Sequence, residues 1–279
     1  MGDSDNDQSD EGRTEGTIKA LTGLVKAVPV YDDALKPVAQ EAGRALGTVG
    51  RAVNAALTPL KGLVWGVETI EEFVQDRVAI KLKSVPPENI QSPDLAVAGP
   101  ALESLRYTGH NETLSEMYAN LLASSMDKET ASQAHPGFVE IIRNMSSDEA
   151  KLLTYFYNQK TVPVIDIRRE ARDNSGGYVV NELVGTYAHD AGCEHREFAA
   201  AYMVNLERLG LVTINRGAWL AAPDAYDRIT EDPKFKEIVE RLDQEEEHKS
   251  RVEKFFVSIT PFGRQFGKAC IASKSGDLK

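Results

Sequence analysis

Apolar residues recur every three or four positions over much of the chain, which is the spacing of a buried helix face. The longest such run starts at Leu35 and continues to Val78, ending before Pro86-Pro87. Pro59 is expected to kink or divide this helix, because proline lacks an amide donor and crowds the preceding turn. A shorter helix is predicted over residues 17–34. The N-terminal half of the chain is therefore expected to be helical.

Capping signals mark the start of further helices. Ser92-Pro93 has the order of an N-cap followed by a proline in the first turn. Thr113–Glu116 and Ser146–Glu149 both have the spacing of a capping box, in which a hydroxyl and a carboxylate each bond a backbone amide. The second box predicts a helix over Ala150–Asn158.

The last third of the chain mixes helical and β-like patterns. Arg196–Leu209 reads as a helix, and Gly210 follows it as a stop signal. Leu211–Ile214 and Phe255–Ile259 read as short strands, and Thr260–Gly263 opens a last helix. Four apolar residues are predicted to share the inward face of the first of these helices: Phe198, Tyr202, Leu206 and Leu209.

This succession of helix, strand, strand and helix is typical of the end of a winged helix-turn-helix. Ala150–Asn158 would be its first helix, Asn181–Ala188 its second and Arg196–Leu209 its third. A helix over Phe235–Glu247 is predicted as an insertion in the wing. The fold class predicted is mainly α, with an N-terminal helical region followed by a winged-helix-like module with a small β wing.

Composition divides the chain into four predicted parts. Residues 1–16 hold no large apolar residue after Met1 and are expected to be a disordered acidic tail. Residues 17–134 form the helical domain, 135–272 the winged-helix-like domain and 273–279 a tail. With two cysteines, no apolar signal segment and no long uninterrupted apolar run, the sequence predicts a cytoplasmic protein.

The long N-terminal helix is basic and rich in glycine. The total charge is -11, yet residues 17–67 hold six bases and three acids, a net +3. Candidate residues for binding a membrane or a partner are Lys36, Arg44, Arg51, Lys61 and Trp65. Glycines that would let another helix approach closely are Gly43, Gly47, Gly50, Gly62 and Gly66. Close packing in a soluble bundle and a helix lying on a membrane both remain open.

No pattern in the sequence indicates catalysis. There is no glycine-rich phosphate loop, no nucleophile elbow and no distinctive carboxylate pair, so no catalytic residue and no cofactor is predicted. His189, Cys193 and His195 are the one cluster that suggests a metal. Their spacing does not match a structural zinc site, which needs four ligands, so no metal is predicted.

Nucleic-acid binding is weakly supported. The outward face of the predicted third helix offers Arg196, Asn205 and Arg208 as candidate contacts to DNA. The wing insertion is acidic, and phosphate contacts dominate affinity for nucleic acids. A protein contact is therefore favoured over DNA for this module.

Four blocks of sequence resemble the abortive infection alpha family, whose members are associated with phage defence. The blocks are Tyr118–Asp127, His135–Ile142, Met145–Leu153 and Ile259–Cys270. The resemblance covers roughly residues 35–271. It implies bacterial antiviral defence with growth arrest or death of the infected cell, and it carries no catalytic residue to this chain.

The function expected is a non-enzymatic antiviral defence protein that acts at the membrane through the basic glycine-rich helix 35–67. A winged-helix regulator that binds nucleic acid and a protein-interaction scaffold are the alternatives. The partners expected are a phage or host protein that acts as trigger and the inner-membrane surface, where the protein would be peripheral. Nucleic acid is disfavoured as a partner, and oligomer formation is left open.

Overall fold

The computed structural model describes residues 66–272 of the chain. The helix predicted over residues 17–34, most of the long helix predicted from Leu35 and the two predicted tails, 1–16 and 273–279, lie outside the described residues.

The first described helix contains a wider turn in its middle. It comprises α3 (Val67–Phe73), the π-helical segment η1 (Val74–Val78) and α4 (Ala79–Leu82). Its inward side chains follow four-residue steps, which drift by about 40° each around an α-helix of 3.6 residues per turn. A π-turn holds more residues and offsets that drift. The side chains kept on one face in this way are Ile70, Val74, Val78 and Leu82.

A helical bundle follows. Its helices are α5 (Leu95–Thr108), α6 (Glu112–Met126), α7 (Gly137–Arg143) and α8 (Ser147–Gln159), with short 3-10 turns η2 (Pro87–Asn89) and η3 (Ala131–Gln133).

Two of the predicted caps are wrong by two residues. Asp94 caps α5, accepting the amide of Ala96 at 2.9 Å, and Asn111 caps α6, accepting the amide of Leu114 at 3.2 Å. Asp and Asn are at least as good N-caps as Ser and Thr, and they precede these helices in extended conformation. The box at Ser146 is confirmed at the start of α8.

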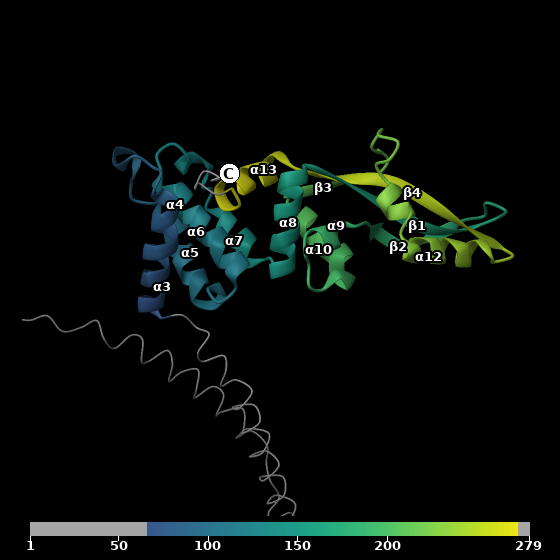
Figure 1. The fold of residues 1–279 in the computed structure, drawn as a ribbon, viewed down its shortest axis with the longest axis horizontal. Helices are drawn as coiled ribbons and strands as arrows, with labels where there is room; N and C mark the ends of the chain where they lie inside the picture. Colours follow the sequence, from purple (N-terminus) through teal and green to yellow (C-terminus); the bar gives the residue numbers. More distant parts are fainter. Residues whose placement is uncertain (1–65, 273–279) are drawn as a thin grey trace, which may run out of the picture. The chain divides into compact units, whose positions relative to one another are not determined.

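The last helix, α13 (Pro261–Cys270), returns from the C-terminal third of the chain to pack against α6 (Figure 1). Two buried polar side chains on α6 satisfy carbonyls at the end of α13. Asn120 Nδ2 donates to the carbonyl of Cys270 at 3.0 Å, and Ser124 Oγ donates to that of Ala269 at 3.1 Å. These bonds meet acceptors that the end of a helix leaves free.

The sheet has four antiparallel strands in the order β2-β1-β4-β3. The bounds are β1 (Thr161–Ala171), β2 (Gly177–Val184), β3 (Val212–Asn215) and β4 (His248–Ile259). The two predicted strands are confirmed as β3 and the end of β4, and they pair with each other. The strands β1 and β2 were not predicted.

Both faces of the sheet are covered. Val162 and Val164 of β1 belong to the main core, which the bundle helices share, whereas Ile165 and Ile167 belong to a second, smaller core. The second core is closed by α11 (Asp227–Thr230) and α12 (Pro233–Asp243), and α12 packs along β4 (Figure 1). The helix predicted between the last two strands is therefore confirmed as α12, and it covers one face of the sheet.

The predicted winged-helix arrangement is not confirmed. The second helix predicted over Asn181–Ala188 is wrong, because Asn181 to Val184 complete β2 and only α9 (Tyr187–Asp190) is helical there. The third helix is present as a short 3-10 turn, η4 (Arg196–Phe198), followed by α10 (Ala199–Arg208). The described residues form a mainly helical fold with one four-stranded sheet.

Candidate functional site

The start of α8 is held to α10 by a buried carboxylate. Glu149 is 7% exposed, and its Oε2 accepts the amide of Ser146 at 2.6 Å while Ser146 Oγ accepts the amide of Glu149 at 3.2 Å. The other oxygen, Oε1, accepts Asn205 Nδ2 at 2.7 Å, and the same Nδ2 lies 3.1 Å from the carbonyl of Asn144. One side chain of α10 thereby completes the cap of α8.

A second carboxylate in the same turn holds the loop before α10. Asp148 accepts the backbone amides of Glu194 at 2.9 Å and His195 at 2.8 Å, and it pairs with Lys151 at 3.1 Å. Burial alone would raise the pKa of Asp148, but the two amides and Lys151 stabilise the carboxylate and bring its pKa below the usual value. The loop is therefore fixed by a charged acceptor.

The suspected metal cluster belongs to this loop. The thiol of Cys193 is buried, 3.6 Å from the carbonyl of Asp148, and burial raises its pKa. The side chains of His189 and His195 are 69% and 60% exposed and lie beside different carboxylates. Within residues 66–272, no group of three or more His, Cys, Asp or Glu side chains is placed to hold a metal ion.

The three candidate DNA contacts all donate hydrogen bonds within the chain. Arg196 Nε donates to the carbonyl of Cys193 at 3.3 Å. Arg208 donates from Nε and Nη2 to Asn205 Oδ1 at 2.9 and 2.7 Å, while Asn205 Nδ2 donates to Glu149. The structure thus brings Asn205 and Arg208 together, but as part of the joint between α8 and α10.

Three apolar side chains are exposed along α10 and the turn before it, beside the charged side chains of Glu207 and Arg208 at its end. Phe198 is 54% exposed and Val204 is 51% exposed, and Ala201 between them is exposed as well. The prediction that Phe198 faces inward is wrong, because Arg196–Phe198 is a 3-10 turn and is out of phase with the α-helix that follows. We call Phe198, Ala201 and Val204 the α10 face. The helical pattern did not predict this face, because it placed Phe198 on the inward side of the helix.

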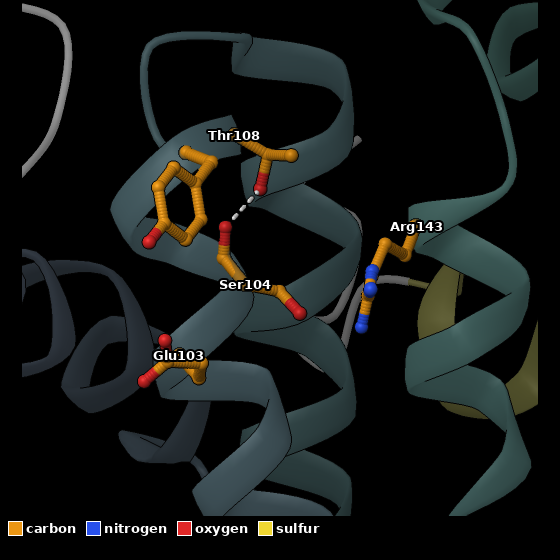
Figure 2. Close-up of a pocket in the computed structure, with 5 residues that line it drawn as sticks. Glu103, Ser104, Thr108 and Arg143 are labelled. Atoms are coloured by element: carbon orange, nitrogen blue, oxygen red, sulfur yellow. Dashed lines mark hydrogen bonds between the residues drawn. The ribbon is translucent and has the colours of Figure 1, made fainter. Parts of the chain in front are cut away.

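A pocket lies between α5 and α7 (Figure 2). Its volume is about 310 Å³, and it is lined by Glu103, Ser104, Tyr107, Thr108 and Arg143. Thr108 Oγ1 donates to the carbonyl of Ser104 at 2.9 Å, the bond drawn in Figure 2. Arg143 is engaged with Glu140 at 3.2 Å.

An acidic group on α9 pairs with one of the helices that cover the sheet. Asp190 of α9 pairs with Arg228 of α11 through two bonds of 2.9 Å and accepts Thr186 Oγ1 at 2.8 Å. Burial works to raise the pKa of Asp190, but the bonds from Arg228 and Thr186 lower it to about 2. This carboxylate is therefore a fixed structural anion at neutral pH.

The remaining predicted site residues lie mostly outside the described part. These are Lys36, Arg44, Arg51, Lys61, Trp65, Gly43, Gly47, Gly50 and Gly62. Gly66 is described: its carbonyl accepts the amide of Ile70 at 3.1 Å, and among the described residues a Cβ at this position would meet no atom within 4 Å. Over residues 66–272, none of the helices combines the length and apolarity needed to cross a membrane.

Comparison with known proteins identifies the family. The family model described as Abortive infection alpha matches residues 66–270. No curated protein matches the sequence. A solved structure of an uncharacterized protein from the hydrocarbon-degrading marine bacterium Alcanivorax borkumensis is 20% identical with a TM-score of 0.31, covering 50% of this chain and 92% of that one. The family match spans well over half of the sequence and confirms the resemblance, and this chain belongs to the abortive infection alpha family.

Proposed function

We propose that this protein is a non-enzymatic abortive-infection protein that works by contact with a protein partner and with the inner-membrane surface. Membership of the family suggests a role in abortive infection, a bacterial defence against phage. The partner is a phage or host protein that acts as trigger, and the α10 face is the surface that meets it.

The observation that carries this proposal is the apolar character of the α10 face. Its exposed side chains, Phe198 and Val204, suit the core of a protein interface, where aromatic and aliphatic anchors provide most of the affinity. The polar groups that DNA recognition would need, Asn205 and Arg208, are bonded to each other and to α8. A protein contact is therefore favoured over the alternative of a nucleic-acid regulator.

Substitution of Val204 by glutamate is expected to abolish protection of cells against phage, because a charge in an apolar interface loses its hydration without a partner. The measurement is the efficiency of plaquing on cells that express the full chain. The matched control is Leu95→Glu, since Leu95 is 83% exposed on α5, away from the α10 face. Melting temperatures of both variants should stay near that of the wild type. Full protection by Val204→Glu would refute the assigned surface.

The membrane part of the proposal rests on the basic glycine-rich segment 35–67. Replacing Arg44, Arg51 and Lys61 with glutamate is expected to abolish co-sedimentation of the purified protein with anionic liposomes, since each basic residue near an anionic surface contributes about 1 kcal/mol. The control makes the same change of charge on α12, at three exposed residues: Lys234, Lys236 and Arg241. Equal binding by both variants would exclude the segment as the membrane contact.

A further inference from the structure

The loop between β3 and α11 exposes a tryptophan. Trp219 is 69% exposed, and no aromatic side chain among residues 66–272 is more exposed. The seven residues 217–223 that surround it carry no charged side chain, and all of them except Leu220 are exposed. We call residues 217–223 the Trp219 loop. It is separate from the α10 face and from the basic segment 35–67.

The base of the Trp219 loop is fixed to the sheet. Leu220 packs against the second core, and its amide donates to the hydroxyl of Tyr226 at 3.1 Å. Tyr226 is buried, and its hydroxyl donates in turn to the carbonyl of Phe255 on β4 at 2.9 Å. Gly217 has a φ of 88°, which allows the chain to turn directly after β3. The indole is therefore presented to solvent by an anchored turn.

The charges beside the loop are of both signs. Arg216 precedes it, and Lys254 lies 5.2 Å from the centre of the Tyr226 ring at its base. Asp224 and Asp227 follow it, and both are exposed. Because these charges offset one another and the tip itself has none, the loop binds through burial of apolar surface and gains little from net charge.

The chemistry of the tip favours a lipid surface as its occupant. Tryptophan is enriched at the boundary of a membrane, where the ring is buried and the indole N–H still finds a polar partner. The exposed neighbours of Trp219 are small and uncharged, so the ring can enter the headgroup layer without burying a charge: Ala218, Ala221, Ala222 and Pro223. A protein interface usually gathers several large anchors, and this loop offers one.

We propose that the Trp219 loop inserts into the headgroup layer of a lipid bilayer, with Trp219 as the anchor. The irregular backbone of the loop keeps the insertion shallow, since amides and carbonyls without partners are costly in the hydrocarbon core. This inference rests on the membrane contact in the proposed function. It adds a second contact that depends on apolar burial, whereas the basic segment depends on charge.

Tryptophan fluorescence of the full chain with vesicles of zwitterionic phosphatidylcholine tests the proposal. The chain has two tryptophans, Trp65 and Trp219, so Trp65→Phe makes Trp219 the sole emitter. We expect a blue shift of its emission when vesicles are added, quenching by brominated lipid, and the same result at high salt. In co-sedimentation, Trp219→Ala should lower the partition coefficient about tenfold, because most of the inserted apolar area is lost.

The matched control places a tryptophan at another exposed apolar site. Leu95→Trp, in a chain with Trp65→Phe and Trp219→Phe, puts the only indole on α5 at a position that is 83% exposed. It should show neither the blue shift nor the quenching. An equal response at position 95, or no response of Trp219 to vesicles, would overturn the proposal. Melting curves of each variant establish that the fold is intact.

Two further results would assign the loop to another occupant and so refute lipid insertion. A shift of Trp219 emission with protein concentration, in the absence of vesicles, would indicate a second copy of the chain. Loss of phage protection in Trp219→Ala, without any response to vesicles, would indicate a protein partner. Replacing Arg44, Arg51 and Lys61 with glutamate should leave the response to zwitterionic vesicles unchanged, so the basic segment and the loop can fail independently.

Discussion

Replacement of Gly263 by alanine is expected to lower the free energy of unfolding by about 3 kcal/mol, the size of effect associated with severe overpacking. Gly263 lies in the first turn of α13, where its amide bonds Thr260 Oγ1 at 2.8 Å. A Cβ there would overlap the carbonyl oxygen of Leu211 and lie 2.9 Å from Ile259 Cγ1. Because a backbone carbonyl is the obstacle, no rotation of a side chain can relieve the clash. Urea denaturation measures the loss.

The control for this prediction is Gly99→Ala. Gly99 lies in the interior of α5, and a Cβ there would meet no atom within 4 Å among the described residues. Alanine is better than glycine in a helix interior by roughly 0.5–1 kcal/mol, but the ring of Pro100 crowds a Cβ on the preceding helical residue, so this variant is expected to stay within about 1 kcal/mol of the wild type. A Gly263→Ala variant as stable as Gly99→Ala would show that α13 does not approach Leu211 as closely as described.

Two glycines in the block Ile259–Cys270, Gly263 and Gly267, have a packing role in the structure. Thr260 caps α13, and Gly263 leaves room for the backbone carbonyl of Leu211. At Gly267, a Cβ would overlap the ring of Tyr157 on α8. The block thus encodes the docking of α13 against α8 and β3, a packing role that is separate from any chemistry.

The helices could be predicted where their signals are local, but of the four strands only β3 and the end of β4 could. Caps and apolar spacing identified the bundle, with Ser146 and Glu149 as the clearest case. In β1 the residues Val164, Ile165 and Ile167 are all buried, because the two cores cover opposite faces, so the strand lacks the alternation that predicts one. In β2 most residues are exposed, so no apolar pattern marks it.

The candidate site was predicted only in part, for a related reason. A helical pattern shows that Asn205 and Arg208 are polar and face away from Leu206, but it does not show that Glu149 lies opposite them. That contact joins residues 56 positions apart in the sequence. The same limit applies to Asn120, whose bond to the carbonyl of Cys270 exists only because α13 packs against α6.

The clamp across the sheet provides the second large expected effect. Asp166 of β1 is 1% exposed; it pairs with Arg216, which follows β3, and its Oδ1 accepts the amide of Leu183 at 2.8 Å. Leu183 has a φ of 52°, a conformation that a branched side chain rarely adopts, at an irregular register of β2. Arg216 also lies 4.8 Å from the centre of the Phe255 ring. The Asp166–Arg216 pair, together with these two further contacts, thereby links β1, β2 and β4 to the residue that follows β3.

Arg216→Ala is expected to lower the free energy of unfolding by about 2–4 kcal/mol, because it leaves the carboxylate of Asp166 buried without its cation. The control is Arg143→Ala, which removes an exposed pair with Glu140 and should cost less than about 1 kcal/mol. Both values come from urea denaturation, with the same slope as the wild type if only stability changes.

A double-mutant cycle separates the ion pair from the packing of Arg216 on Phe255. Once Asp166 is replaced by alanine, the buried charge that Arg216 neutralises is gone, so Arg216→Ala should add only the loss of its contact with the ring and of its exposed pair with Glu182 at 4.0 Å. We therefore expect a coupling of at least about 1 kcal/mol between the two positions, the range seen for residues in direct contact. Additive effects would mean that Arg216 supports the sheet by packing alone, and that the strained turn at Leu183 depends on Asp166 without help from its cation.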